Sequence, residues 1–290
     1  MPFAATAFAL ASILLWSTLA VLSSQLAPLP SLLITGIALC IGGLVGVVKA
    51  REWRVPLVTF AVGCGGIFGY HVLLFAAFHL APAVEANLIN YLWPLLIVVL
   101  SPVFLRSYPL RPHHYAGALL GIIGAGMIVT GGRLTLDLAH LGGYLCAAAA
   151  ALTWACYSLL TKRLPAFSSA AVGGFCLSAG ALSLALFALT GPTAAFTALS
   201  GRDWLILAAL GLGPMGTAFF AWDAALKRGD PRVIGSLSYL TPLLSTFNLV
   251  VIGGRPFTWV SAAAMVLIVV GAAVGSLDLF RSIARKRVGP

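Results

Sequence analysis

Residues 90–96 read Asn-Tyr-Leu-Trp-Pro-Leu-Leu, and residues 238–244 read Ser-Tyr-Leu-Thr-Pro-Leu-Leu. The two stretches share the pattern Tyr-Leu-x-Pro-Leu-Leu at a separation of 148 residues. Three further matches occur in the same order along the chain: Trp16 with Trp154 at 138 residues, Ala76 and Ala77 with Ala224 and Ala225 at 148, and Gly124 with Gly271 at 147. Four matches in one order indicate an internal duplication, which is how many membrane transporters are built.

The duplicated sequence is too apolar for a water-soluble protein. Of the 290 residues, 61% are hydrophobic and only 8% are charged, whereas an ordinary soluble domain has about 25% charged residues. One crossing of the bilayer takes about 20 apolar residues, and the chain contains ten such runs. They cover approximately residues 4–24, 31–48, 57–79, 83–103, 114–131, 142–161, 169–190, 203–226, 231–252 and 257–277.

Each copy of the repeat contains five of these runs. Because five is odd, the second copy crosses the membrane in the opposite sense to the first. We therefore predict an all-α integral membrane protein whose ten transmembrane helices form two inverted five-helix repeats around a central cavity. The halves are residues 1–140 and 141–280, and residues 281–290 form a basic tail. In such folds the substrate site lies between the halves near the membrane midplane.

The distribution of basic residues predicts which helix ends face the cytoplasm. Connections on the side of the N-terminus carry 14 of the 17 lysines and arginines, and the opposite connections carry three. By the positive-inside rule, both termini are cytoplasmic. The net charge of +10 does not indicate nucleic-acid binding, because the basic residues are spread over short loops. The first run lacks a basic n-region, so we interpret it as a retained helix.

The chain lacks the motifs of enzymes, metal sites and ATP-driven pumps. It contains no Cys-x-x-Cys pair, no His-Glu-x-x-His, no Gly-x-Ser-x-Gly and no phosphate-binding P-loop. All five cysteines fall within apolar runs, where they are expected to be small packing residues. We therefore expect no catalytic residue and no bound metal or cofactor.

Two apolar runs carry a polar face. Asn87, Asn90, Tyr91 and Pro94 follow helical spacing and share one face. An unpaired carboxamide in hydrocarbon costs several kcal/mol, so this face points at other helices or at a wet cavity. The run at 231–252 repeats the pattern with Gly235, Ser238, Tyr239, Pro242, Ser245 and Thr246. Hydrogen bonding between helices, worth about 0.6 kcal/mol on average, is the alternative to a cavity.

The two prolines of the repeat predict breaks in their helices. Each proline removes a backbone donor and pushes away the carbonyl four residues earlier, so Pro94 and Pro242 free the carbonyls of Asn90 and Ser238. Such carbonyls accept hydrogen bonds from a substrate ammonium, while Asn amides and Tyr hydroxyls donate to a carboxylate. The alternative is that the prolines only kink their helices.

Several aromatic residues lie away from the membrane interfaces, where tryptophan usually collects. Trp16, Trp93 and Trp154 are close to mid-span, and a flat ring with one N–H suits a wall that stacks on aromatic substrates. Other candidates for this wall are Tyr70, Tyr91, Tyr157, Phe175 and Tyr239, with Phe68 and Trp222 in addition. Ordinary core packing is the alternative for each of them.

His71 is the one ionisable residue that the sequence places well inside an apolar run. Ionisable residues within a membrane usually have a function, and histidine titrates near neutrality. We predict that His71 forms a hydrogen bond with substrate or takes part in a proton-linked step. A purely structural histidine is the alternative.

The chain resembles the drug/metabolite transporter superfamily with EamA-type halves. The resemblance rests on the ten runs, the paired halves, the central tryptophans of runs 1 and 6 and the x-Pro-Leu motifs of runs 4 and 9. Within this superfamily, the chain is most similar to the YddG-type aromatic amino acid exporters of bacterial inner membranes. The resemblance implies an alternating-access carrier for aromatic amino acids and similar small metabolites. It also implies a cavity lined by helices 1, 3, 4, 6, 8 and 9, with helices 5 and 10 as scaffold.

Other functions remain open from the residues alone. An exporter of cationic or hydrophobic drugs has the same fold, although no Asp or Glu lies at mid-depth to attract a cation. A channel requires a longer polar path than the two short polar faces provide. The expected partners are a small-molecule substrate and membrane lipid. A monomer fits the sequence, which leaves the oligomeric state and the energy source undetermined.

Overall fold

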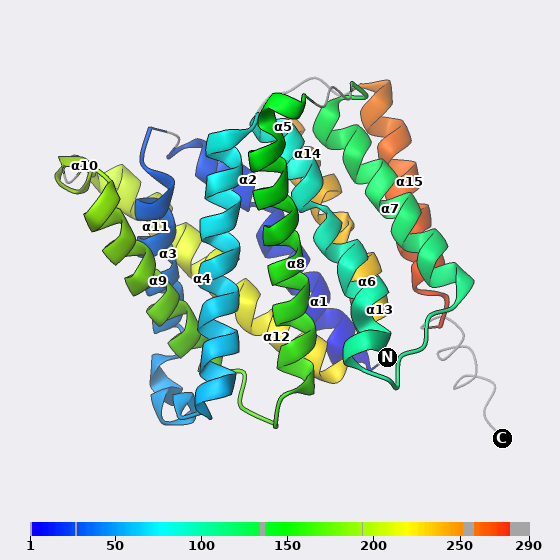
Figure 1. The fold of residues 1–290 in the computed structure, drawn as a ribbon, viewed down its shortest axis with the longest axis horizontal. Helices are drawn as coiled ribbons and strands as arrows, with labels where there is room; N and C mark the ends of the chain where they lie inside the picture. Colours follow the sequence, from blue (N-terminus) through cyan, green and yellow to red (C-terminus); the bar gives the residue numbers. More distant parts are fainter. Residues whose placement is uncertain (1, 27, 134–136, 193, 252–257, 279–290) are drawn as a thin grey trace.

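A computed structural model describes residues 2–26, 28–133, 137–192, 194–251 and 258–278. Within these ranges the chain is helical and contains no strand. Seven helical segments are long and apolar enough to cross a membrane, and the bent pair α3 and η1 makes an eighth. The chain is thus a multi-pass, all-helical protein whose helices lie side by side in one bundle (Figure 1).

The helices follow the apolar runs of the sequence. The first half contains α1 (Phe3–Ser17), α2 (Leu19–Ser24), α3 (Ser31–Leu44), the 3-10 helix η1 (Val47–Trp53), α4 (Leu57–Leu80), α5 (Ala83–Asn90), α6 (Leu92–Phe104) and α7 (Pro112–Thr130). The 3-10 helix η2 (Leu138–His140) ends the first half. The second half contains α8 (Leu141–Arg163), α9 (Ala171–Thr190), α10 (Ala194–Thr197), α11 (Gly201–Leu212), the π-helical turn η3 (Gly213–Thr217), α12 (Ala218–Arg228), α13 (Pro231–Ser238), α14 (Leu240–Val251) and α15 (Trp259–Gly275).

Two of the expected spans are broken at matching positions. The helix break between α5 and α6 falls at Tyr91, and the break between α13 and α14 falls at Tyr239. Each tyrosine lies three residues before a proline, Pro94 or Pro242, as expected when a proline displaces the carbonyl of the preceding turn. The central part of each span therefore has irregular backbone.

A third span changes helix type without ending. The wide π turn of η3 joins α11 to α12 and contains Gly213, Pro214 and Gly216. Single π turns inside α-helices are rare and occur frequently at functional sites. A Cβ added at Gly216 would collide with the Gly211 carbonyl and with the backbone of Gly42 on α3. The turn is thus packed directly against a neighbouring helix.

Helices α7 and α15 pack through glycines along much of their length. A Cβ at Gly117 would lie 2.7 Å from the carbonyl oxygen of Gly271 and would collide with the backbone of Gly275. A Cβ at Gly124 would lie 2.8 Å from the carbonyl oxygen of Ala264. Small residues let the two backbones approach closely. Helices in lipid are not driven together by the hydrophobic effect, so the van der Waals packing at this close contact stabilises the pair.

We predict that Gly117→Ala destabilises the protein by about 1–3 kcal/mol, the usual cost of an overpacked contact. The new methyl group meets backbone atoms of α15, which cannot rotate away. The midpoint of thermal unfolding in detergent is the measurement. The matched control is Gly65→Ala in α4, where a Cβ meets no atom within 4 Å. Equal midpoints for the two variants contradict the close contact of α7 with α15.

Candidate functional site

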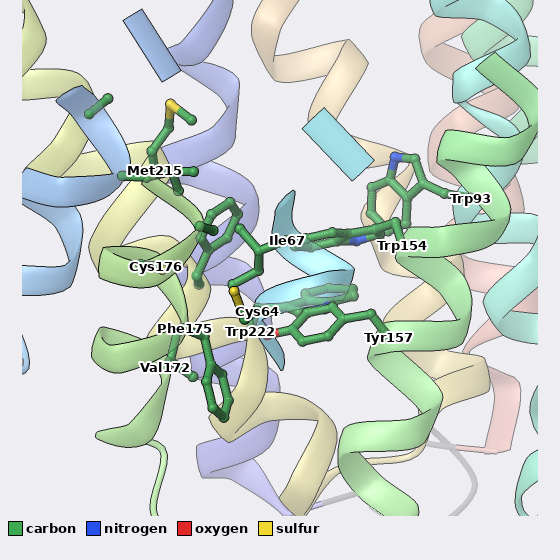
Figure 2. Packing of buried hydrophobic residues seen from close by; sticks show 14 of the residues in the cluster. Cys64, Ile67, Trp93, Trp154, Tyr157, Val172, Phe175, Cys176, Met215 and Trp222 are labelled. Atoms are coloured by element: carbon green, nitrogen blue, oxygen red, sulfur yellow. The ribbon is translucent and has the colours of Figure 1, made fainter. Parts of the chain in front are cut away.

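Aromatic side chains from both halves of the chain meet in the middle of the bundle. This central aromatic cluster consists of Trp16 on α1, Tyr70 on α4, Trp93 on α6, Trp154 and Tyr157 on α8, and Phe219 and Trp222 on α12. Figure 2 shows the side chains of Trp154 and Tyr157 extending from α8 toward the middle of the bundle. The cluster thus joins three helices of the first half to two of the second.

Trp154 is at the centre of this cluster. Its ring centroid lies 5.1 Å from that of Tyr70, 5.2 Å from Tyr157, 5.4 Å from Phe219 and 5.7 Å from Trp16. Most of the contacts are tilted or edge-to-face, the arrangements that the quadrupoles of aromatic rings favour. The rings therefore form one continuous, packed aromatic cluster that is mostly buried.

Two tryptophans of the cluster have hydrogen-bond acceptors for their indole N–H groups. Trp16 Nε1 donates to the Pro214 carbonyl of η3 at 3.0 Å. Trp222 Nε1 donates to Ser158 Oγ at 3.0 Å in a fully buried position. Both bonds connect different helices, so they fix the ring orientations as well as satisfying the donors.

One edge of the cluster is polar and uncharged. Asn90 Nδ2 donates to the hydroxyl oxygen of Tyr70 at 3.3 Å, and Tyr70 contacts Trp154. The other amide atom, Asn90 Oδ1, is buried and accepts no hydrogen bond from the residues that the structure describes. An acceptor in this state favours a ligand that brings an N–H or O–H group.

His71 lies beside the same edge. Its ring centroid lies 5.1 Å from that of Tyr70 and 6.3 Å from that of Phe219. The Nδ1 atom is 2.7 Å from the carbonyl oxygen of Ile67, and a carbonyl only accepts hydrogen bonds. Nδ1 therefore carries the proton, which leaves Nε2 of the neutral ring as an acceptor. His71 and Asn90 each have a hydrogen-bond acceptor beside the central aromatic cluster.

The remaining candidates fall into two groups. Asn87 and Tyr91 are half-buried near the break between α5 and α6, close in sequence to Asn90. Phe175 belongs to the same hydrophobic core, but its ring contacts are outside the central aromatic cluster. Ser238 and Tyr239 lie outside this core.

Phe175 extends from α9 and its ring packs against Phe60 and Phe167 (Figure 2). The Ser238 hydroxyl donates to the Ile234 carbonyl of its own helix. Tyr239 is fully buried in a separate group with Ala125, Leu243 and Ile268, and its ring fills the space beside Gly121. The two tyrosines of the sequence repeat thus have different surroundings.

Phe219 and Pro214 were not among the residues that the sequence singled out. Phe219 lies three residues before Trp222, so both side chains share one face of α12. The three-residue spacing of Phe219 and Trp222 could therefore have identified Phe219 from the sequence. The Pro214 carbonyl carries no such signal, because a backbone acceptor becomes part of a site only through the shape of its turn.

Charged side chains close the end of the bundle that carries most of the basic loops. Lys162 Nζ donates to the carbonyls of Leu226 and Gly229, each at 2.6 Å, so α8 is fixed to the C-terminal end of α12. Arg232 pairs with Asp230 at 2.6 Å and donates to the Pro109 carbonyl.

Tyr108 lies between these two cations, 5.3 Å from Lys162 and 5.5 Å from Arg232. Burial and the Asp230 carboxylate raise the pKa of the Tyr108 phenol against the opposing effect of Arg232. The phenol therefore stays neutral and offers its ring to both cations.

A second charged group ties α7 to the residues that follow α15. Asp278 pairs with Arg111 at 2.9 Å, and Nε2 of His113 and of His114 lie 3.5 and 3.4 Å from its carboxylate. Burial raises the pKa of the Asp278 carboxyl, but Arg111, the two histidines and Arg232 outweigh burial and hold the pKa below its usual value.

The two histidines and Asp278 also bring possible metal ligands within 4.8 Å of one another. However, His114 Nδ1 accepts a hydrogen bond from the Arg111 backbone N–H. Its Nε2 must then carry the proton and has no lone pair for a metal. The group is therefore an ion-pair network.

Different contacts tie the opposite end of the bundle. The hydroxyl of Tyr144 on α8 donates to Glu85 Oε2 on α5 at 2.7 Å. Asn248 Nδ2 on α14 donates to Ser17 Oγ on α1 at 3.1 Å. The central aromatic cluster thus lies between two sets of polar ties. The buried carboxylate next to it, that of Asp223, is paired with Lys227 at 2.6 Å.

Comparison with known proteins identifies related sequences over nearly the whole chain. Residues 4–130 and 141–277 each match the EamA-like transporter family. The chain is 43% identical to the "Aromatic amino acid exporter YddG" of Ancylobacter novellus over 94% of this chain and 97% of that protein. It is 27% identical to the exporter of the same name from Escherichia coli K12, over 88% of this chain and 90% of that protein. A solved crystal structure with 42% identity superposes with a TM-score of 0.91 over 97% of this chain and 99% of that one.

The geometry of His71 predicts its tautomer. Because Nδ1 faces the Ile67 carbonyl, we expect the neutral ring to be protonated at Nδ1 and unprotonated at Nε2. Nitrogen chemical shifts of the protein labelled with ¹⁵N-histidine measure this directly. His71→Gln identifies the signal by removing it from among the five histidines. A resonance pattern with the proton on Nε2 is incompatible with the bond to Ile67.

Proposed function

The chain belongs to the EamA-like transporter family, and from this premise we propose that it exports aromatic amino acids by alternating access. The observation that carries the proposal is the central aromatic cluster with its polar, uncharged edge. The family membership and the 43% identity to an aromatic amino acid exporter support it.

We propose that the ten apolar runs are ten membrane spans, and that the halves at 1–140 and 141–280 are inverted repeats. Helix pairing supports this. The fifth run packs on the tenth (α7 with α15), the second on the seventh (α3 with α9) and the fourth on the ninth (α6 with α13). The third packs on the sixth (α4 with α8), and the first packs on the eighth (α1 with α12). Exchanging each run for its counterpart reproduces the same set of pairs, as a twofold axis between the halves requires.

The proposed substrate follows from the chemistry of the cluster. An aromatic amino acid has a flat apolar ring at one end and a zwitterion at the other. The indoles of Trp16, Trp93 and Trp154 suit the ring. The lone pairs of Asn90 Oδ1 and His71 Nε2 suit the ammonium group, and amide and phenol donors suit the carboxylate. Neither this site nor a zwitterion has a net charge, so binding does not bury a charge that lacks a partner.

A cationic drug is the second candidate substrate. The four indoles of the cluster favour it, because a cation over an indole face is attracted by the ring quadrupole. The pairing of the buried Asp223 with Lys227 opposes it, because this carboxylate is already neutralised and an unpaired cation is costly in a low-dielectric site.

We propose that the two sets of polar ties are the gates of the transport cycle. The rings of the cluster contact one another, so a substrate enters only when α1 and α12 move relative to α8. The π turn at η3 and the breaks at Tyr91 and Tyr239 supply hinge points for this movement. At each stage, the ties at one end hold while those at the other end separate.

Transport by purified protein in liposomes tests the substrate. We expect saturable movement of labelled phenylalanine, with the apparent affinity of Trp154→Ala reduced by roughly tenfold because the central ring is lost. The matched control is Trp204→Ala, since Trp204 is 43% exposed on α11 and outside the cluster. Size-exclusion chromatography establishes that both variants are folded.

Three results contradict this function. Movement no faster than in protein-free vesicles rejects phenylalanine as substrate. Efflux of a quaternary ammonium dye without phenylalanine efflux favours the drug exporter. Flux that rises linearly with concentration indicates a channel.

Cysteine labelling tests the proposed topology. In a variant without native cysteines, we expect Leu138→Cys to react with a membrane-impermeant maleimide in intact cells, because residue 138 is 82% exposed at the outer end of α8. Arg51→Cys, in the exposed η1, should react only after the membrane is permeabilised. Labelling of both positions in intact cells overturns the proposed orientation.

A further inference from the structure

A cavity of about 740 Å³ lies at the basic end of the bundle, outside the central aromatic cluster. It is formed by the end of α3, η1, the chain just before α9, and α12. Its lining includes Val45, Lys49, Phe167, Ser168, Phe220 and Arg228. None of the central tryptophans contributes to it, so it is separate from the proposed transport site.

The charged residues of this cavity are all basic. Lys49, Lys227 and Arg228 line it, and no lining residue is acidic. Lys227 is already neutralised by Asp223 at 2.6 Å. Lys49 is exposed and pairs with no acidic group among the residues that the structure describes. Arg228 is exposed and uses one donor on the Ala224 carbonyl. Two cations are therefore available to an anion, whereas the carboxylates beside the lining, Glu52 and Asp223, already bind Ser168 and Lys227.

Above the cations, the wall of the cavity becomes apolar. The lining continues along α12 from Arg228 to Phe220 and Thr217. Eleven residues of helix cover about 16 Å at 1.5 Å per residue, which is roughly half of a 30 Å hydrocarbon core. The stretch of α12 that lines the cavity is thus about as long as one membrane leaflet is thick.

The helix η1 adds an independent observation. It bends by 88° from α3, so its axis runs across the direction of the bundle (Figure 1). Val48 is 93% exposed and Val47 is 49% exposed, and both adjoin Lys49. A segment that crosses the bundle end and exposes valines beside lysine and arginine is typical of an element lying in the membrane interface.

We propose that this cavity binds an anionic phospholipid of the cytoplasmic leaflet. Lys49 and Arg228 bind the phosphate, and one acyl chain lies along α12 against Phe220. The leaflet assignment rests on the topology proposed above, whereas the binding chemistry does not. Basic pockets between membrane helices on the cytoplasmic side are suited to such headgroups.

The lipid explains the cavity better than the transported amino acid or a soluble anion. A zwitterionic amino acid needs an acceptor for its ammonium group, which this lining does not provide with a carboxylate. A free phosphate uses the two cations but leaves the apolar wall without a partner. A phospholipid uses both parts of the cavity at once.

Native mass spectrometry of the purified protein tests the proposal. After delipidation, the protein is titrated with phosphatidylglycerol or with phosphatidylethanolamine. We expect a preference for phosphatidylglycerol, and roughly tenfold weaker binding of it by the double variant Lys49→Gln, Arg228→Gln. The matched control, Arg106→Gln with Arg163→Gln, removes two exposed basic residues that do not line the cavity. Phe220→Ala should also weaken lipid binding.

A competition experiment distinguishes a phospholipid from a soluble phosphate as the ligand of the cavity. Glycerol phosphate at millimolar concentration should not displace the lipid, because it lacks an acyl chain. Displacement by glycerol phosphate identifies a soluble-anion site and overturns the proposal. Equal binding of phosphatidylglycerol and phosphatidylethanolamine also overturns it. Equal loss of binding in the two double variants rejects these residues as the site. If the double variant does not elute as a folded protein, Lys49→Gln alone decides. This experiment measures lipid binding and not transport. A negative result therefore rejects the lipid site without rejecting the proposed transport function.

Discussion

The hydrogen bond from Trp16 Nε1 to the Pro214 carbonyl joins the first helix of the chain to the π turn of the second half. An indole N–H inside a membrane protein needs an acceptor, since an unpaired donor there costs several kcal/mol. The bond fixes the Trp16 ring against Trp154, and η3 leads directly into the helix that carries Phe219 and Trp222. One backbone acceptor thus sets how the two halves meet at the central aromatic cluster.

The distribution of charge follows the same constraint. Charged side chains collect at the helix ends, where hydrogen bonds of Lys162 and ion pairs of Arg232 and Asp278 tie neighbouring segments together. The middle of the bundle relies on aromatic contacts and on the neutral groups of Tyr70, His71 and Asn90. A centre of this kind binds a neutral or zwitterionic molecule without separating charges. In the proposed transport cycle, opening and closing are then controlled at the two ends of the bundle.

Rigid and irregular helices have separate positions in the bundle. Helices α7 and α15 are held together by glycine contacts at Gly117 and Gly124, which leave no room for movement. The spans around the aromatic cluster contain the breaks at Tyr91 and Tyr239 and the π turn. Movement is therefore expected in the helices that carry the cluster, while α7 and α15 act as a frame.

The apolar runs, the resemblance to a transporter family and the helix breaks at the prolines could all be predicted from the amino-acid sequence. These depend on the local chemistry of consecutive residues, such as the proline that interrupts its own helix. The sequence also pointed to Trp16, Trp93 and Trp154, because tryptophan at mid-span departs from its usual place at the interface.

The face of each helix that points inward could be read only from the folded protein. In a membrane both faces of a helix are apolar, so periodicity does not separate lipid contacts from protein contacts. Tyr239 matches Tyr91 in the sequence repeat, yet it is packed beside Gly121, and Phe175 lies against Phe60 and Phe167. Phe219 and the Pro214 carbonyl belong to the centre because of how α12 is rotated and how η3 turns. Helix rotation and turn shape are fixed by neighbouring helices, and no residue specifies them alone.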